Sequence, residues 1–218
     1  MLRVGLTGGV ACGKTTVARM FAQRGARVVY ADEIARELMQ PGQAVYDDVV
    51  HSFGRGILEP EGPINRARLA QLVFDPKRPR VEELNRIVHP AVIARQEEWM
   101  AEVERREPDA VAMVEAALIL EAGVRDRFDR IVVVTCIPEQ KAERFARRTS
   151  MEQDLAAARA EVERRSAAQI SDAEKARSAD FVIDNSGALE ATEAQVERVW
   201  AELKQLAESG HGGTETRR

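Results

Sequence analysis

The sequence has only two cysteines and three histidines in 218 residues, and aromatic residues make up 5% of it. Cys12 and Cys136 have neither the paired spacing of a metal site nor the density of a disulfide framework. No apolar run approaches the length of a membrane span, and no charged-then-apolar signal segment opens the chain. These absences argue against a disulfide-stapled or membrane-spanning protein, and we expect a cytoplasmic one.

The chain also lacks an excess of positive charge. Its 36 acidic and 32 basic residues give a formal net charge of −4, which argues against an electrostatic preference for nucleic acid or for anionic membranes. We expect neither as a partner, and the sequence gives no sign of an obligate protein partner. Hydrophobic residues make up 44% of the chain and charged residues 31%, which is typical of a globular protein with one core.

What the chain does have is a glycine-rich segment directly after its first apolar run, residues 2–7. Residues 8–15 read GGVACGKT and match the phosphate-binding loop G-x-x-x-x-G-K-[ST] in its required setting between a strand and a helix. The glycines let backbone N–H groups turn inward at the positive end of that helix. Lys14 can reach the β and γ phosphates, and the Thr15 hydroxyl can ligate Mg²⁺. The alternative is a plain glycine turn with Lys14 in solvent.

Four further segments have the continuous apolar character of buried strands, and helical stretches alternate with them. This pattern predicts a parallel sheet covered on both faces, with strands over residues 26–31, 110–115, 130–136 and 179–184. Two helical regions look inserted, and the first covers residues 33–106. The second, 149–177, has so little apolar material that we expect it to pack lightly and move.

Asp32 stands just past the second predicted strand. In a parallel sheet it would lie at the same edge as the phosphate loop, where ligands of open α/β sheets bind. A carboxylate there could accept the proton of an attacking hydroxyl. Asp is also favoured as the N-cap of a helix that begins at Glu33, and the two roles are compatible. If Asp32 is not the base, Glu115 and Glu121 are the next carboxylates to test.

Arg144, Arg147 and Arg148 share one face of a predicted helix after Pro138. A mobile lid could bring such guanidinium groups onto migrating phosphoryl oxygens. The alternative is an ordinary solvated face, which is what charge runs usually are. Arg164 and Arg165 leave the same choice open.

Three more residues have two interpretations each. His89, before Pro90, could touch a ligand, but the pair more often marks a junction between helices. Asn185 could recognise a base edge or serve as a turn residue in Asn-Ser-Gly. Cys12, beside a helix N-terminus and Lys14, could have a lowered pKa and react readily, or could be a small filler residue.

Together these pieces resemble the dephospho-coenzyme A kinase family over residues 2–206. The His-Pro pair and the Gln-x5-Lys pattern ahead of Ile-Asp-Asn are its more specific features. The similar segments are the phosphate loop 6–16, residues 31–36, the insertion 65–74 with 84–90, the lid residues 144–148, Arg165, Gln169 and Lys175, and the terminal strand 179–187.

The resemblance implies an α/β P-loop kinase fold with a five-stranded parallel sheet in the order 2-3-1-4-5. It implies a single domain over residues 1–207. The core would comprise 1–32, 107–148 and 178–207, with an acceptor-binding helical insertion at 33–106, a lid at 149–177 and a disordered tail at 208–218.

The activity that the resemblance implies is transfer of phosphate from ATP, as co-substrate with Mg²⁺, to the ribose 3′-hydroxyl of dephospho-coenzyme A. This is the last step of coenzyme A synthesis. Asp32 would be the base, while Lys14, Arg144 and Arg148 would stabilise the moving charge. The expected acceptor contacts are Thr7, Asp32, Arg66 and His89. The expected ATP contacts are Gly9, Val10, Ala11, Cys12, Gly13, Lys14, Thr15, Thr16, Arg148 and Asn185.

Four positions depart from the family pattern. Ala11 stands where the family usually has Gly, Cys12 where it has Ser, Tyr30 where it often has Asp, and Ala117 where proline is frequent. The loop works through backbone N–H groups, so we expect these small replacements in it to preserve function. The closest rival is another small-molecule kinase of the same fold, acting on a nucleotide, a sugar acid or shikimate. A GTP switch is disfavoured because the chain has no Asn-Lys pair.

Overall fold

The computed structural model describes residues 1–75 and 77–210. They divide into two compact units, one formed by Met1–Val29 with the chain from Met100 onward, the other by Tyr30–Trp99. Most of the tail predicted at 208–218 lies outside the described residues, and Glu208 is the last residue of a helix. Among the described residues, no helix combines the length and the apolar character that crossing a membrane requires.

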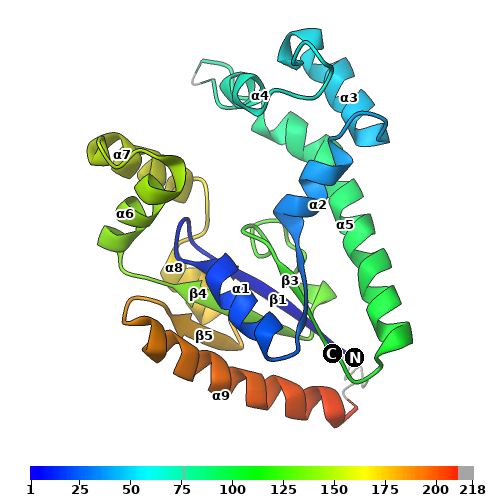
Figure 1. Cartoon of the computed structure of the whole chain (residues 1–218), viewed down its shortest axis with the longest axis vertical. Coiled ribbons are helices and arrows are strands. Elements are labelled where there is room, and N and C mark those ends of the chain that lie inside the picture. Colours follow the sequence, from blue (N-terminus) through cyan, green and yellow to red (C-terminus); the bar gives the residue numbers. More distant parts are fainter. Residues whose placement is uncertain (76, 211–218) are drawn as a thin grey trace. The chain divides into compact units, whose positions relative to one another are not determined.

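A five-stranded parallel sheet forms the centre of the first unit, and its order β2-β3-β1-β4-β5 confirms the prediction (Figure 1). In register, Leu6 of β1 lies between Glu115 of β3 and Val132 of β4. All five predicted strands are present, and their ends agree within two residues. The strands are β1 (Leu2–Gly8), β2 (Arg27–Tyr30), β3 (Val111–Glu115), β4 (Arg130–Thr135) and β5 (Phe181–Asp184).

Burial follows position in the sheet. Strand β3 is buried along its whole length, as is the run Ile131–Val134 in β4. Each has a strand on both sides and apolar side chains on both faces, which explains their continuous hydrophobic sequences. The edge strands are different, because β2 has no fully buried residue and Val182 of β5 is exposed. Edge strands were therefore the weaker sequence signals.

The helices of the first unit pack in two sets. Helices α1 (Lys14–Gln23) and α9 (Leu189–Glu208) pack against each other, and both contact the sheet. Helix α8 (Asp172–Arg177) packs on β4, whereas α6 (Pro138–Thr149) and α7 (Leu155–Ala167) lie side by side (Figure 1). A short 3-10 turn, η2, covers Arg125–Arg127.

Within the region 149–177, α7 buries one pair of apolar residues. Ala158 and Val162 of α7 are buried in an apolar cluster with Phe145 and Ala146 of α6. Val10 of the phosphate loop is part of the same cluster. The expectation that this region packs lightly and moves stays a prediction, since Ala158 and Val162 are the buried residues of α7 and most of its other side chains are exposed.

The second unit is helical. Its elements are α2 (Ala31–Leu38), α3 (Ala44–Phe53), the 3-10 turn η1 (Arg55–Ile57), α4 (Arg66–Val73) and α5 (Val81–Arg106), of which the part up to Trp99 belongs to this unit. An isolated antiparallel bridge joins Leu58 to Ile64 around the Pro-Gly-rich turn. Asn65 caps α4, since its side chain accepts a hydrogen bond from the Arg68 N–H at 2.9 Å.

Helix α5 continues through His89 and Pro90, so the predicted helix junction at this pair is wrong. Proline has no N–H, so the Arg86 carbonyl lacks the hydrogen bond that residue 90 would otherwise donate. The proline ring also crowds the preceding turn of the helix. The helix has 26 residues, so many other hydrogen bonds and packed side chains offset that local cost.

Candidate active site

The phosphate loop joins β1 to α1 in the first unit. Gly13, the N-cap of α1, has φ 93°, a left-handed conformation, and a Cβ at this position would collide with the Asn185 side chain. Only glycine meets both demands without strain. In the described structure the first turn of α1 carries no acidic residue and no side-chain cap. No carboxylate of that turn therefore competes with an anion at the positive end of α1.

Lys14 lies back across the loop. Its ammonium donates to the Gly9 carbonyl at 2.9 Å and to the Gly8 carbonyl at 3.2 Å. The loop thus holds one positive charge at the N-terminus of α1. This arrangement suits the β and γ phosphates of a nucleotide.

Thr15 and Glu115 form an oxygen pair beside the loop. The exposed Thr15 hydroxyl donates to Glu115 Oε2 at 3.5 Å, and Glu115 is the last residue of β3. A hydroxyl and a carboxylate are the hard oxygen donors that Mg²⁺ prefers, and this ion usually takes few protein ligands beside water and phosphate. The residues therefore fit a magnesium ion. The described residues contain no larger cluster of His, Cys, Asp or Glu suited to a metal.

Arg144 and Asn185 hold the far side of the loop. Arg144 Nη2 donates to the Asn185 carbonyl at 2.8 Å, and Asn185 Nδ2 donates to the Cys12 carbonyl at 2.9 Å. Arg144 is therefore not part of a solvated face. Asn185 is buried, and its Oδ1 accepts from the Thr192 hydroxyl at 3.0 Å. The sequence did not suggest that these residues hold the loop. Contact of Asn185 with a nucleotide base stays a prediction.

The other arginines are arranged differently from Arg144. Arg148 is exposed, with its guanidinium 5.5 Å from the centre of the Phe145 ring, and Arg165 stacks on the same ring at 5.1 Å. Arg164 and Arg165 both bind Glu161 at 2.7 Å. Mainly the hydrogen bond from Arg164, with a further one from Arg165, lowers the pKa of Glu161 to about 2.

Cys12 does not have the reactive environment that its place in the loop suggested. Its side chain is fully buried, and Sγ donates to the Gly9 carbonyl at 3.0 Å. Burial raises the pKa of the thiol and outweighs the attraction of the nearby Lys14 charge. The hypothesis of a lowered pKa is wrong, and the alternative of a small packed residue is confirmed.

Asp32 belongs to the second unit, where it is the second residue of α2 and exposed. The N-cap of this helix is Tyr30, so the alternative interpretation of Asp32 as a cap is wrong. The helix starts at Ala31, two residues earlier than expected. Alanine has a high helix propensity, so Ala31 joins the helix and does not end the strand. An exposed carboxylate in a first helical turn is still favoured by the helix dipole.

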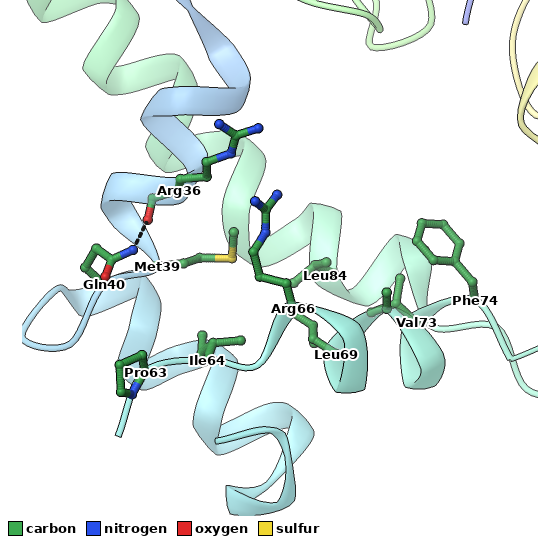
Figure 2. A pocket seen from close by; sticks show the side chains of 11 residues that line it. Arg36, Met39, Gln40, Pro63, Ile64, Arg66, Leu69, Val73, Phe74 and Leu84 are labelled. Atoms are coloured by element: carbon green, nitrogen blue, oxygen red, sulfur yellow. Dashed lines mark hydrogen bonds between the residues drawn. The ribbon is translucent and has the colours of Figure 1, made fainter. Parts of the chain in front are cut away.

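A cavity of about 220 Å³ lies within the second unit. Its wall is largely apolar, and Arg36 of α2 and Arg66 of α4 extend from it. Figure 2 shows both guanidinium groups pointing away from the apolar side chains of Ile64 and Leu69. An apolar cleft with two cations is suited to a ligand that carries both a flexible chain and phosphate groups.

Two predicted acceptor contacts lie elsewhere. Thr7 is fully buried, and its hydroxyl donates to the Ala117 carbonyl at 3.1 Å. His89 is half-buried on α5, is not among the described residues that line the cavity, and has a pKa lowered by burial. The structure thus groups only Arg66 with the cavity, and direct contact of Thr7 or His89 with an acceptor stays a prediction.

Sequence reasoning gave Arg36 no role of its own, although it lies in the similar segment 31–36, and it missed the ion pair between Lys141 and Asp172. Arg36 stands one helical turn after Asp32, so the i, i+4 spacing was an available signal. The Lys141–Asp172 pair joins residues 31 apart in the chain, and no local pattern announces such a contact.

A parallel sheet in this order with a G-x-x-x-x-G-K-T loop between β1 and α1 defines a P-loop kinase. The fold alone does not choose an acceptor. A shikimate kinase from Bacteroides thetaiotaomicron shares it with a TM-score of 0.51 at 15% identity, over 93% of this chain and 98% of that one.

The chain belongs to the dephospho-CoA kinase family, whose model matches residues 2–191. A dephospho-CoA kinase from Aquifex aeolicus is 38% identical over 203 residues, which are 93% of this chain and 98% of the relative. A solved protein from Thermus thermophilus has a TM-score of 0.71 at 28% identity, over 93% of this chain and 97% of its own. Family and fold thus agree over nearly the same span.

Proposed function

We propose that the protein phosphorylates the ribose 3′-hydroxyl of dephospho-coenzyme A with ATP, which completes coenzyme A. The observation that carries this proposal is the family match over residues 2–191, because it includes both the phosphate loop and the helical insertion. The protein works in the cytoplasm with these two small molecules, and needs neither nucleic acid, membrane nor an obligate protein partner. The two cysteines, which are free thiols, accord with a reducing compartment.

The phosphate loop binds the transferred group. Backbone N–H groups of residues 9–16 and the Lys14 ammonium hold the β and γ phosphates. Thr15, with Glu115 behind it, holds Mg²⁺, which when bound neutralises charge on the phosphate oxygens. The bond between Arg144 and the Asn185 carbonyl supports this role, since Asn185 in turn holds the Cys12 carbonyl of the loop.

Two further groups act on the moving charge and on the attacking hydroxyl. Arg148 is exposed on α6 and free to swing from the Phe145 ring onto the phosphoryl oxygens. Asp32 orients the ribose 3′-hydroxyl and takes its proton. Its exposure at the start of α2 supports this role, because a substrate hydroxyl can reach an exposed carboxylate.

The cavity in the second unit holds the rest of the acceptor. Dephospho-coenzyme A has a diphosphate and a long amide chain, which match the two arginines and the apolar wall in chemical character. Arg36 and Arg66 bind the diphosphate, and the chain lies along Ile64 and Leu69. This assignment extends the acceptor role of Arg66 to Arg36.

A panel of acceptors tests the proposal. ATP consumption with Mg²⁺ is measured against dephospho-coenzyme A, shikimate, gluconate and a nucleoside monophosphate at matched concentrations. We expect kcat/KM for dephospho-coenzyme A to exceed the others by at least about 100-fold, because a site built for specific polar groups rejects ligands that lack them. An equal or higher value for any other acceptor would overturn the assignment.

A further inference from the structure

Helix α8 carries a charged side chain that is completely buried, the ammonium of Lys175. A charge in a protein interior is costly unless it is paired and hydrogen-bonded. Lys175 binds Glu121 at 2.7 Å, Gln169 Oε1 at 3.0 Å and the Ala117 carbonyl at 3.4 Å. Three acceptors therefore surround one ammonium group, two from the segment after β3 and one from the residues just before α8.

The Ala117 carbonyl links this ammonium to the phosphate loop. The same oxygen accepts the Thr7 hydroxyl at 3.1 Å, one residue before the loop begins. Ala117 stands two residues after Glu115, the carboxylate that accepts the Thr15 hydroxyl. Lys175 thus holds the segment 115–117, which contacts Thr7 before the phosphate loop and Thr15 at its end.

Glu121 depends on Lys175 for its charge balance. Its Oε1 also accepts the Ile170 N–H at 3.2 Å, whereas its Oε2 is buried without a hydrogen-bond partner among the described residues. A buried carboxylate oxygen without a hydrogen bond is costly, and a cation beside the carboxylate offsets part of that cost. The pair therefore fastens the segment before α8 to the segment after β3.

The first residue of α8 contacts the phosphate loop itself. Asp172 pairs with Lys141 of α6, and its carboxylate occupies the space where a side chain on Gly9 would lie. One short helix therefore contacts the phosphate loop through Asp172 and braces its flanks through Lys175. Through the Asp172–Lys141 pair, α8 is also connected to α6, the helix that carries Arg144 and Arg148.

We propose that Lys175 is a positioning residue for phosphoryl transfer. It keeps the Ala117 carbonyl, Thr7 and the Glu115–Thr15 pair in register with the loop, without touching either substrate. The inference rests on the proposed function and assigns to Lys175 a role in rate, beyond the stability that its ion pair gives.

The test separates rate from stability with three variants. Lys175→Met removes the ammonium and leaves Glu121 unpaired. Lys175→Met/Glu121→Gln replaces the pair by neutral groups, and Arg177→Met is the matched control, an exposed cation on the same helix. The thermal midpoint, kcat and KM for ATP are measured for each variant and the parent on dephospho-coenzyme A.

We expect the single variant to melt earlier and the double variant to recover most of the midpoint. In the double variant kcat should stay about 10- to 100-fold low with KM for ATP within about threefold, since small misplacements in a site cost rate more than binding. Arg177→Met should match the parent in all three.

A double variant that regains both the midpoint and the parental kcat would show a purely structural ion pair and overturn the inference. If the double variant does not fold, Gln169→Leu replaces it in the test, because this change removes only one neutral acceptor of the Lys175 ammonium. A parental kcat in Gln169→Leu would also overturn the inference. If the parent protein does not phosphorylate dephospho-coenzyme A, both the proposed function and the inference fail. If the parent is active and the variants have its kcat, the inference alone fails.

Discussion

Among the single residues, Cys12 and Ala11 show how the phosphate loop tolerates its unusual side chains. Cys12 turns its sulfur inward to the Gly9 carbonyl, where it packs as a small apolar group. Ala11 adopts φ 56°, a left-handed conformation that costs an alanine about 1–2 kcal/mol. The family's usual glycine would avoid this cost. The loop therefore keeps its backbone shape at the expense of some local strain.

The buried thiol makes a direct prediction. A thiol-alkylating reagent should label Cys12 in the native protein at least about tenfold more slowly than in urea, because the thiolate is both scarce and shielded. Cys136, whose pKa burial raises to about 11, should be protected likewise. Peptide mass spectrometry gives the two rates. Native labelling of Cys12 at the unfolded rate, slowed by Mg-ATP, would restore the reactive-thiol interpretation.

Asp32 can be tested against its neighbour. Asp32→Asn and Glu33→Gln remove carboxylates from the same exposed first turn of α2, so each should cost about 0.3–1 kcal/mol of helix-dipole stabilisation. Only Asp32→Asn should lower the single-turnover rate, by about 10²–10⁴-fold if the residue is a general base. Thermal midpoints and rapid-quench rates distinguish the two. Equal rates for the two variants would remove Asp32 from the chemistry.

Among the helices, α6 separates its arginines. Arg144 turns toward the Asn185 carbonyl, Arg148 lies over the Phe145 ring, and Arg147 is exposed. Spacing along the helix placed these residues on one face, but it could not say which of them has a partner in a distant strand or loop. Of these three arginines, Arg144 is the one that contacts the phosphate loop, since its Nη1 donates to the Cys12 carbonyl at 3.4 Å.

This arrangement predicts different effects for adjacent arginines. Arg148→Ala should lower kcat by about 10²–10³-fold with a smaller change in ATP affinity, since a lost contact to developing charge acts on the transition state. Arg147→Ala is the control and should change kcat little. Steady-state kinetics with varied ATP provide both numbers. If the two variants behave alike, Arg148 belongs to a solvated face.

The strands and the phosphate loop could be predicted because their signals are local. The run Ile131–Val134 is apolar since both faces of β4 are covered, and the loop motif has a fixed spacing. The start of α2 could not be placed, because Ala31 suits both the end of a strand and the start of a helix. The course of α5 through Pro90 was missed because the local proline signal favours a break.

Side-chain partners were the least predictable part of the site. Lys175 and Ala117 are 58 residues apart, and Asn185 and Cys12 are 173 apart. Such contacts form only when the sheet brings distant strand ends to one edge. The sequence motif singled out Lys175, but neither its burial nor its partners follow from spacing. The contacts that the motif residue Lys175 makes are therefore visible only in the fold.

Across the whole chain, the residues with roles in the proposed reaction are distributed over the two units. The first contains the phosphate loop, the oxygen pair of Thr15 and Glu115, and the arginines of α6. The second contains Asp32 and the cavity with Arg36 and Arg66. Each unit thus has the chemistry for one substrate, nucleotide in the first and acceptor in the second.

The position of the transferred phosphate tests the proposed reaction. The protein is incubated with Mg²⁺, dephospho-coenzyme A and ATP labelled at the γ-phosphate, with Lys14→Met as the control that lacks the loop cation. We expect the label in coenzyme A, at a ribose phosphate released by a 3′-nucleotidase, and a loss of at least about 100-fold in Lys14→Met. Label that appears only as inorganic phosphate, or equal transfer by Lys14→Met, would contradict the account.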